Sequence, residues 1–531
     1  MKPKLGTFVT ALLAGTFATA ALAQELGRVH FETSCTPQAQ EKFDRGLAMV
    51  HSFFYPDSVQ AFTEVAAADP QCAIAYWGIA ISHRPNPLIL PLSTAVLKNG
   101  LEAVEKGKTI GAKTERERDW LAAIELYYRD YDKVDQTTRG LAYEKAMERL
   151  AQKYPDDPEA AVFYALALNE TALPSDKTYA KQLKAGAILE KIAATLPEHP
   201  GVLHYLIHSY DYPPLAQRGL DAANKYAAVA PAAQHAQHMP SHTYSMIGLW
   251  EQSVASNTKS RAIAQEQAAR LWPGATHPGE PHHLDFMVYA LLQMGQEGRA
   301  KQLRDDSSAV KKLGFEYLAS YTALAAIPAR FALERQAWKE AAVLEPMGSQ
   351  FPQAEAITYF ARAIGSARSG DLAAADREVD KLKELRATLE RANQSYWAEQ
   401  VEVQMLAASA WMAHAKGEEK EALKLMRAAA DVEDNSEKHI AMENRLYPMR
   451  ELLGDLLLGQ QQPGAALTEY ETSLESTPNR LRGLYGAAKA AEAASQPEKA
   501  NAYFRKLLEV TKDADADRVE IGEAKAFLTN R

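Results

Sequence analysis

Regularly spaced histidines are the residues of this sequence most suited to chemistry. Nine of the fourteen histidines lie within residues 199–283. Two pairs in this region share a spacing of four residues, His204 with His208 and His238 with His242. Residues four apart lie on the same face of a helix. Each pair therefore predicts two imidazoles that point in the same direction.

The two pairs are themselves related by an offset of 34 residues. This offset indicates that they occupy equivalent positions in successive copies of a repeated unit. His235 lies three residues before His238, on the same predicted face. Aligning Gly248 with Gly295 extends the register to a third copy and matches His235, His238 and His242 with His282, Asp285 and Tyr289, respectively.

The elements that would position these residues are helices. Ala, Leu, Glu, Lys and Arg dominate the chain, and apolar residues recur at spacings of three and four. A 34-residue period also occurs near the C-terminus, where Gly454, Ala466, Tyr470 and Pro478 match Ala488, Ala500, Phe504 and Lys512. Pro463 and Pro497 share the same offset.

With this period the chain resembles the tetratricopeptide repeat (TPR) family, whose unit is a 34-residue helix pair. Further stretches with the pattern are "GLWEQSVASN", "GQEGRA", "GDLAAA" and "GEEKEA". The chain is also similar to a group of exported bacterial TPR proteins, through "SCTPQAQEKFDRGLAMVHSFFY", "CAIAYWGIA", "QHMPSHTY" and "PNRLRGLYGAAKAAE". The resemblance implies an all-α, right-handed superhelical solenoid of antiparallel helix pairs. It implies no particular activity.

The resemblance also implies an orientation, because the first helix of each TPR pair lines the concave surface. Neighbouring helices pack ~8–10 Å apart, so imidazoles from two of them can reach one ion. Imidazole suits zinc, copper, nickel or iron. The four predicted metal ligands are His204, His208, His238 and His242. His282 and Asp285 are predicted to act as a fifth ligand or as orienting groups, and His235 and Tyr289 as further contacts to a bound ligand.

Two alternatives use the same surface. The histidines can hydrogen-bond a bound peptide or protein segment without metal, or they can satisfy buried polar groups between helices. A metal-dependent enzyme is a third function, with Asp285 as the nearest candidate base. The sequence has no H-E-x-x-H, G-x-S-x-G, phosphate-loop or dinucleotide-binding motif, and enzyme activity is the less favoured interpretation.

The N-terminus predicts export. Residues 1–23 combine Lys2 and Lys4 with an apolar run and end in "ALA", which is typical of a signal peptide and predicts a periplasmic protein. In an oxidising compartment, the only two cysteines, Cys35 and Cys72, favour a disulfide.

Two classes of partner are disfavoured by the rest of the sequence. No later apolar run is long enough to span a bilayer. A net charge of −9 without a basic stripe argues against nucleic acid as a partner.

Two Pro/Gly-rich or polar interruptions divide the predicted array. "LWPGATHPGEP" at residues 271–281 predicts a loop insertion, and residues 431–448 delay the next repeat and can cross the mouth of a groove. The predicted parts are therefore N-terminal repeats over 24–270, central repeats over 271–430 and C-terminal repeats over 431–531.

Overall fold

The structure is a computed structural model that describes residues 25–84 and 86–529. Its regular elements over this part of the chain are helices, with one isolated bridge between Thr276 and Leu313. The predicted signal peptide, residues 1–23, lies outside the described residues. Among the helices that are described, none has the length and apolar character needed to cross a membrane.

The chain divides into two compact units. Among the described residues, unit 1 contains 25–84, 86–171, 184–206 and 224–237, and unit 2 contains 172–183, 207–223 and 238–529. The three-part division at residues 270 and 430 stays a prediction.

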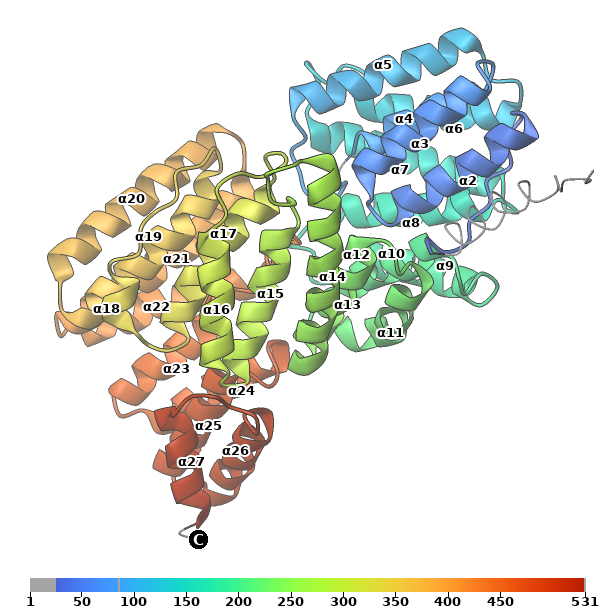
Figure 1. The fold of residues 1–531 in the computed structure, drawn as a ribbon. Coiled ribbons are helices and arrows are strands. Elements are labelled where there is room, and N and C mark those ends of the chain that lie inside the picture. Colours follow the sequence, from blue (N-terminus) through green and yellow to red (C-terminus); the bar gives the residue numbers. More distant parts are fainter. Residues whose placement is uncertain (1–24, 85, 530–531) are drawn as a thin grey trace, which may run out of the picture. The chain divides into compact units, whose positions relative to one another are not determined.

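Unit 1 is built from antiparallel helix pairs that follow one another along the chain (Figure 1). Its complete helices are α2 (Pro37–His51), α3 (Tyr55–Ala68), α4 (Ala75–Ser82), α5 (Thr94–Ile110), α6 (Glu115–Tyr128), α7 (Gln136–Lys153) and α8 (Pro158–Glu170). The unit boundary falls within α9 (Ala180–Ala193), α10 (Pro200–Tyr210), α11 (Leu220–Val229) and α12 (Gln234–His238).

Local sequence explains where several unit 1 helices begin and how they are held. Ser93, Thr114 and Asp135 precede α5, α6 and α7, and each side chain accepts a backbone N–H of the first turn. The predicted disulfide is confirmed: Cys35, before α2, is bonded to Cys72, before α4. The core is aromatic, with Phe31, Phe43, Trp77, Trp120 and Phe163 in mutual ring contact.

Unit 2 contains the longer part of the array. Its elements are η1 (Ala216–Gly219), α13 (Pro240–Met246), α14 (Trp250–Leu271), α15 (Glu280–Gln293), α16 (Glu297–Ser308), α17 (Leu318–Leu333), α18 (Trp338–Ala341), α19 (Pro352–Ser369), α20 (Leu372–Arg391), α21 (Ser395–Ala415), α22 (Glu419–Asp434), α23 (Met449–Gly459), α24 (Pro463–Ser476), α25 (Leu481–Ala493), α26 (Pro497–Val510) and α27 (Val519–Thr529).

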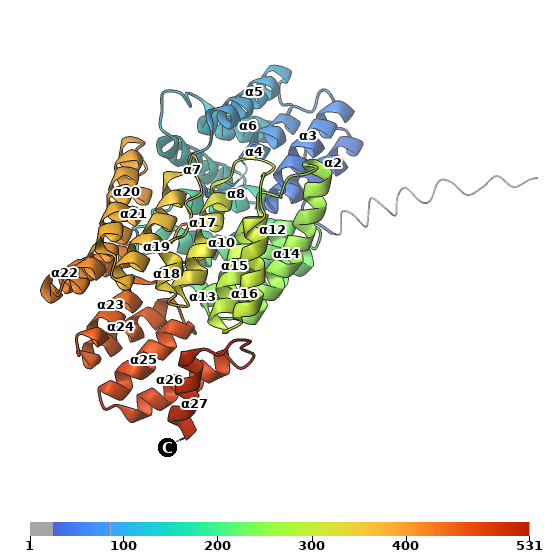
Figure 2. The ribbon, with the colours of Figure 1, turned by 60° about the vertical axis from the view of Figure 1, so that its left-hand side comes forward.

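Two layers of helices form this array. The odd-numbered helices from α13 to α25 each contact the next odd-numbered helix, and together they are called the inner layer. The even-numbered helices pack between them to form the second layer, as the neighbouring α19, α20, α21 and α22 show in Figures 1 and 2. The predicted all-α solenoid of antiparallel helix pairs is thus confirmed.

The C-terminal repeat pattern has a direct steric cause. The ring of Tyr470 lies between Gly454 and Gly486, where a Cβ atom on either glycine would come within 2.7 Å and 2.2 Å of ring atoms, respectively. Only glycine allows the helices to approach this ring so closely. Pro463 and Pro497 both lie in the first turns of their helices, where a missing N–H costs no intrahelical hydrogen bond.

The α22–α23 loop, residues 435–448, lies against the inner layer. Arg330 of α17 donates to the carbonyl oxygens of Asn444 and Arg445 at 2.7 and 2.9 Å. Tyr396 of α21 donates to the carbonyl oxygen of Glu437 at 2.9 Å. Helix side chains therefore satisfy the backbone of this loop much as they would the backbone of a bound peptide.

Candidate metal centre

Three buried histidines of unit 2 come together from three helices. His238 ends α12, His242 belongs to α13 and His282 belongs to α15. One ring nitrogen of each lies within 4.8 Å of the other two. Their residues are 1, 2 and 8% exposed, so water has little access to them.

The local sequence places His238 and His242 side by side across a helix break. Pro240 lacks an N–H, and α12 ends at His238 while α13 begins at Pro240. The backbone at Met239 nevertheless stays in the right-handed helical region. The four-residue spacing therefore still brings the rings together, with the two Nε2 atoms 3.1 Å apart.

Asp211 fixes the tautomer of His242. Its Oδ2 lies 2.8 Å from Nδ1 of His242 and 3.3 Å from the ammonium nitrogen of Lys438. Burial raises the pKa of Asp211, and Lys438 opposes this rise. Because Oδ2 already accepts from a cation, the proton of the Asp211–His242 hydrogen bond lies on Nδ1 of His242.

Asn257 fixes the tautomer of His238 in the same way. The amide nitrogen of Asn257 donates to the carbonyl oxygen of Ser253 at 2.9 Å, which identifies the other amide atom as the oxygen. That oxygen lies 2.7 Å from Nδ1 of His238. Nδ1 of His238 is therefore the donor, and its proton is used in this contact.

Both rings are neutral in this environment. Burial lowers the pKa of His238 to about 4, although the hydrogen bond with Asn257 opposes the shift. Burial also lowers the pKa of His242 well below its ordinary value, and the nearby His238 and Lys438 add to the effect. A second proton, which would bridge the two rings, is thus disfavoured near neutral pH.

The consequence is an arrangement that favours a cation. With the proton of each neutral ring on Nδ1, both Nε2 atoms present lone pairs, and these face each other at 3.1 Å. Two facing lone pairs repel each other. A metal ion accepts electron density from both nitrogens and converts the repulsion into coordination. Metal-binding histidines are commonly oriented by an acceptor that takes a hydrogen bond from their other ring nitrogen. Asp211 and Asn257 are such acceptors here.

An aromatic ring covers this centre. The ring centroid of Phe286 lies 4.9, 4.9 and 5.0 Å from those of His238, His242 and His282. His283 approaches His238 with a centroid distance of 4.8 Å. The three rings are buried, and low access to water strengthens electrostatic interactions among them.

A second histidine cluster, in unit 1, has a different character. Glu159 bridges His51 and His199 through separate carboxylate oxygens, each at 2.9 Å. The other nitrogen of His51 contacts the hydroxyl of Tyr205 at 3.1 Å, and that of His199 accepts the N–H of Val202. Burial would raise the pKa of Glu159, but the two imidazoles outweigh it and hold this pKa below its usual value. Hydrogen bonds within the protein fully account for this cluster.

The predicted histidines fall in different units. His204 and His235 belong to unit 1, where their Nε2 atoms are 3.1 Å apart and Nδ1 of His204 donates to the carbonyl oxygen of His51. His208 belongs to unit 2, and its ring centroid is 6.3 Å from that of His242.

The remaining predicted residues lie in ion-pair networks of unit 2. Asp285 accepts from Arg330 at 2.9 Å, and both are buried. The hydroxyl of Tyr289 accepts from Arg480 at 2.8 Å. In the structure, then, α15 directs His282 toward the histidines, while Asp285 and Tyr289 contact arginines.

The residues that orient the rings were not identified from the sequence. Asp211 follows His208 by three residues, just after the end of α10, and its closeness to this histidine in the sequence is a signal that could have identified it. Asn257 and Lys438 are far from the histidines along the chain and follow no repeat offset. Their roles are visible only in the folded unit.

Comparisons with known proteins add little to this picture. No family model and no curated protein matches the chain. Among solved structures, the complex of Naa15/Naa10 bound to HypK-THB is similar at 12% identity and a TM-score of 0.25, covering 98% of this chain and 94% of that one. The human IFIT1 dimer with m7Gppp-AAAA is similar at 11% identity and a TM-score of 0.38, covering 93% and 100%.

Proposed function

We propose that the protein binds a transition-metal ion in unit 2. His238, His242 and His282 are the ligands of this proposal, and Asp211 and Asn257 orient the first two. The observation that carries it is the pair of Nε2 lone pairs that face each other at 3.1 Å while both Nδ1 protons are used elsewhere.

The distance between the two nitrogens suits a shared ion. Metal–nitrogen bonds of ~2.0–2.1 Å at a tetrahedral angle separate two ligand nitrogens by about 3.3 Å. The separation of 3.1 Å needs only a small adjustment. Neutral imidazoles suit zinc, copper, nickel and iron, and three protein ligands leave a coordination position for water or another molecule. Together with the Cys35–Cys72 disulfide, the site fits an exported protein that captures or carries a metal.

One observation favours metal binding over a peptide-binding scaffold. The inner-layer helices α17 and α21 use Arg330 and Tyr396 to bind the chain's own α22–α23 loop. This loop takes the place on those helices that a foreign peptide would need. A peptide partner in unit 2 would first have to displace it.

Metal content tests the proposal directly. Untagged protein, purified without chelators, should contain about one transition-metal ion per chain by elemental analysis. After chelation, Zn²⁺ and Cu²⁺ titrations against a chromophoric chelator should show one high-affinity site. The double variant His238→Gln, His242→Gln should lose this site and keep the helical circular dichroism of the wild type.

The unit 1 cluster supplies the matched control. His199→Gln changes a histidine that is equally buried but hydrogen-bonded to Glu159, so the metal content should not change. Loss of metal in His199→Gln but not in the double variant would refute the assignment. So would a stripped wild-type protein that takes up neither ion at micromolar concentration.

A further inference from the structure

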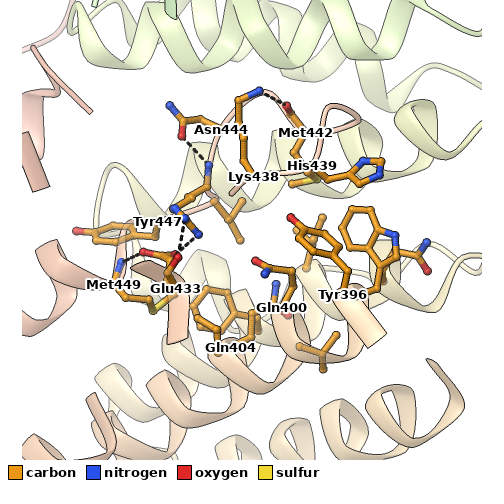
Figure 3. Close-up of a pocket in the computed structure, with 18 residues that line it drawn as sticks. Tyr396, Gln400, Gln404, Glu433, Lys438, His439, Met442, Asn444, Tyr447 and Met449 are labelled. Carbon is orange, nitrogen blue, oxygen red and sulfur yellow. Dashed lines mark hydrogen bonds and ion pairs between the residues drawn. The ribbon is translucent and has the colours of Figure 1, made fainter. Parts of the chain in front are cut away.

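A pocket in unit 2 lies between two inner-layer helices and the α22–α23 loop. Residues of α19 and α21 form one side, and residues of the loop form the other. Figure 3 shows Tyr396, Gln400 and Gln404 of α21 across from Lys438, His439, Met442 and Asn444 of the loop. The pocket contains about 620 Å³ of empty space, part of which is open to solvent.

Aromatic rings line both sides of this pocket. The ring of Trp397 lies 5.1 Å from that of Tyr396 and 4.7 Å from that of His439, measured between centroids. Burial lowers the pKa of His439 to about 3, so this ring is neutral and part of the aromatic surface. A planar apolar group of a ligand can pack against these rings.

The charged residues at the pocket are already compensated within the protein. The ammonium of Lys438 contacts Asp211 at 3.3 Å, so Lys438 contributes mainly the aliphatic part of its side chain to the pocket. Arg445 donates to the carbonyl oxygens of Glu433 and Ser436 and lies 3.5 Å from the Glu433 carboxylate. A charged ligand would find no uncompensated counter-ion here and would lose its hydration on entry. A neutral ligand is therefore favoured.

Carboxamides give the pocket its polar character. Gln353 and Gln404 both line it, and their side-chain oxygens are buried with no hydrogen-bond partner among the described residues. The amide of Gln400, on the same wall, donates to the hydroxyl of Ser436. Buried polar atoms are nearly always hydrogen-bonded in native proteins. Donor groups on a bound ligand would satisfy the two glutamine oxygens.

We infer that this pocket binds a neutral small molecule that combines an aromatic or other flat ring with N–H or O–H donors. The ring packs against Trp397 and Tyr396, and the donors face the glutamine carboxamides. The α22–α23 loop completes the site, because its residues form the opposite wall. The proposed metal ligands do not line this pocket, and Lys438, which contacts Asp211, is the side chain that the pocket and the metal centre share.

Two fluorescent probes that differ by one charged group test this ligand class. N-phenyl-1-naphthylamine is neutral and carries an N–H donor, and 8-anilinonaphthalene-1-sulfonate has the same rings with an added sulfonate. The full chain should bind the neutral probe at one saturable site with blue-shifted emission. The anionic probe should bind at least about tenfold more weakly, a difference of about 1.4 kcal/mol. Equal affinity for the two probes, or no saturable binding of the neutral one, would overturn the inference.

A matched pair of variants on α21 locates the site. Gln404 is half-buried and lines the pocket, so Gln404→Trp should fill it and weaken the neutral probe by at least about tenfold. Met405 is also half-buried but is not a lining residue, so Met405→Trp should leave the affinity unchanged. Unchanged binding in Gln404→Trp would place the probe elsewhere and refute the assignment. Repeating the titration on metal-stripped protein keeps this result separate from the outcome for the metal centre.

Discussion

Asp211 and His242 form a buried hydrogen bond of 2.8 Å whose carboxylate oxygen also contacts Lys438. The carboxylate makes Nδ1 of His242 the donor and increases the basicity of the opposite nitrogen. Asp211 thus prepares His242 for metal binding without being a ligand itself.

Asp211→Asn should therefore weaken metal binding without abolishing it. Removing such an orienting carboxylate lowers metal affinity by about 10- to 100-fold in other sites. Zn²⁺ competition with a chromophoric chelator measures the change. Asp376→Asn, at an exposed position of α20, is the control and should bind as the wild type does. An unchanged affinity in Asp211→Asn would mean that this carboxylate does not act on the site.

Metal removal should loosen the region of unit 2 around the three histidines. A ligand present at 100 times its Kd stabilises the state that binds it by about 2.7 kcal/mol. Amide hydrogen exchange of peptides from α13 and α15 should therefore slow when Zn²⁺ is added to stripped protein. Peptides from α2 in unit 1 should not respond. The same slowing in His238→Gln, His242→Gln would show that it has another cause.

Periodicity allowed the helical array to be predicted, because the contacts behind it repeat along the sequence. The offset of 34 residues that relates Tyr470 to Phe504 reflects one aromatic ring packed at the same place in successive helix pairs, and both residues are buried. The Cys35–Cys72 disulfide followed from there being only two cysteines. Such regularities depend on local geometry and can therefore be recognised in a single sequence.

The candidate site was only partly predictable, because its oriented contacts are not periodic. Their spacing identified His238 and His242 as two of four ligands and His282 as a fifth ligand or an orienting group, and these three lie together. Asp285 was placed beside them by the same register, but the buried Arg330 provides its ion-pair partner. That partner belongs to the following inner-layer helix. Spacing along one helix does not show which neighbouring helix supplies the opposite charge.

Glu443 should make the stability of unit 2 depend on pH. Burial raises the pKa of Glu443 to about 8, although Arg330, 4.0 Å away, opposes the rise. The folded state then binds this proton more tightly than the unfolded state, whose pKa is near 4.5. The stabilisation is fully present below pH 4.5 and is lost as the pH rises through 8.

Glu443→Gln removes this titration, because a neutral amide replaces the carboxyl group. As the pH rises from the unfolded-state pKa near 4.5 to the folded-state pKa of about 8, the free energy of unfolding of the wild type should fall by up to about 5 kcal/mol relative to the variant. Urea unfolding at pH 5, 7 and 9 measures the difference. Glu418→Gln, at an exposed position, should follow the wild type at every pH. Parallel pH profiles for Glu443→Gln and the wild type would contradict the expected titration.

Because Gly486 lies so close to the ring of Tyr470, replacing it by alanine should destabilise the protein, although alanine is the better helix former. Alanine is favoured over glycine in a helix by up to about 1 kcal/mol. At Gly486, however, the added carbon would lie 2.2 Å from the Tyr470 ring, which is buried and held on its other side by Gly454. Overpacking of this kind costs about 1–3 kcal/mol, so Gly486→Ala should lower the free energy of unfolding.

Gly464→Ala is the matched control for this prediction. An added carbon at Gly464, in the first turn of α24, would meet no atom within 4 Å, so this substitution should be neutral or slightly stabilising. Replacing Tyr470 by leucine should reduce the penalty of Gly486→Ala, because residues in contact have non-additive effects. Urea unfolding of the four variants measures both differences. Additive effects of the two substitutions would show that the ring contact does not limit how closely these helices pack.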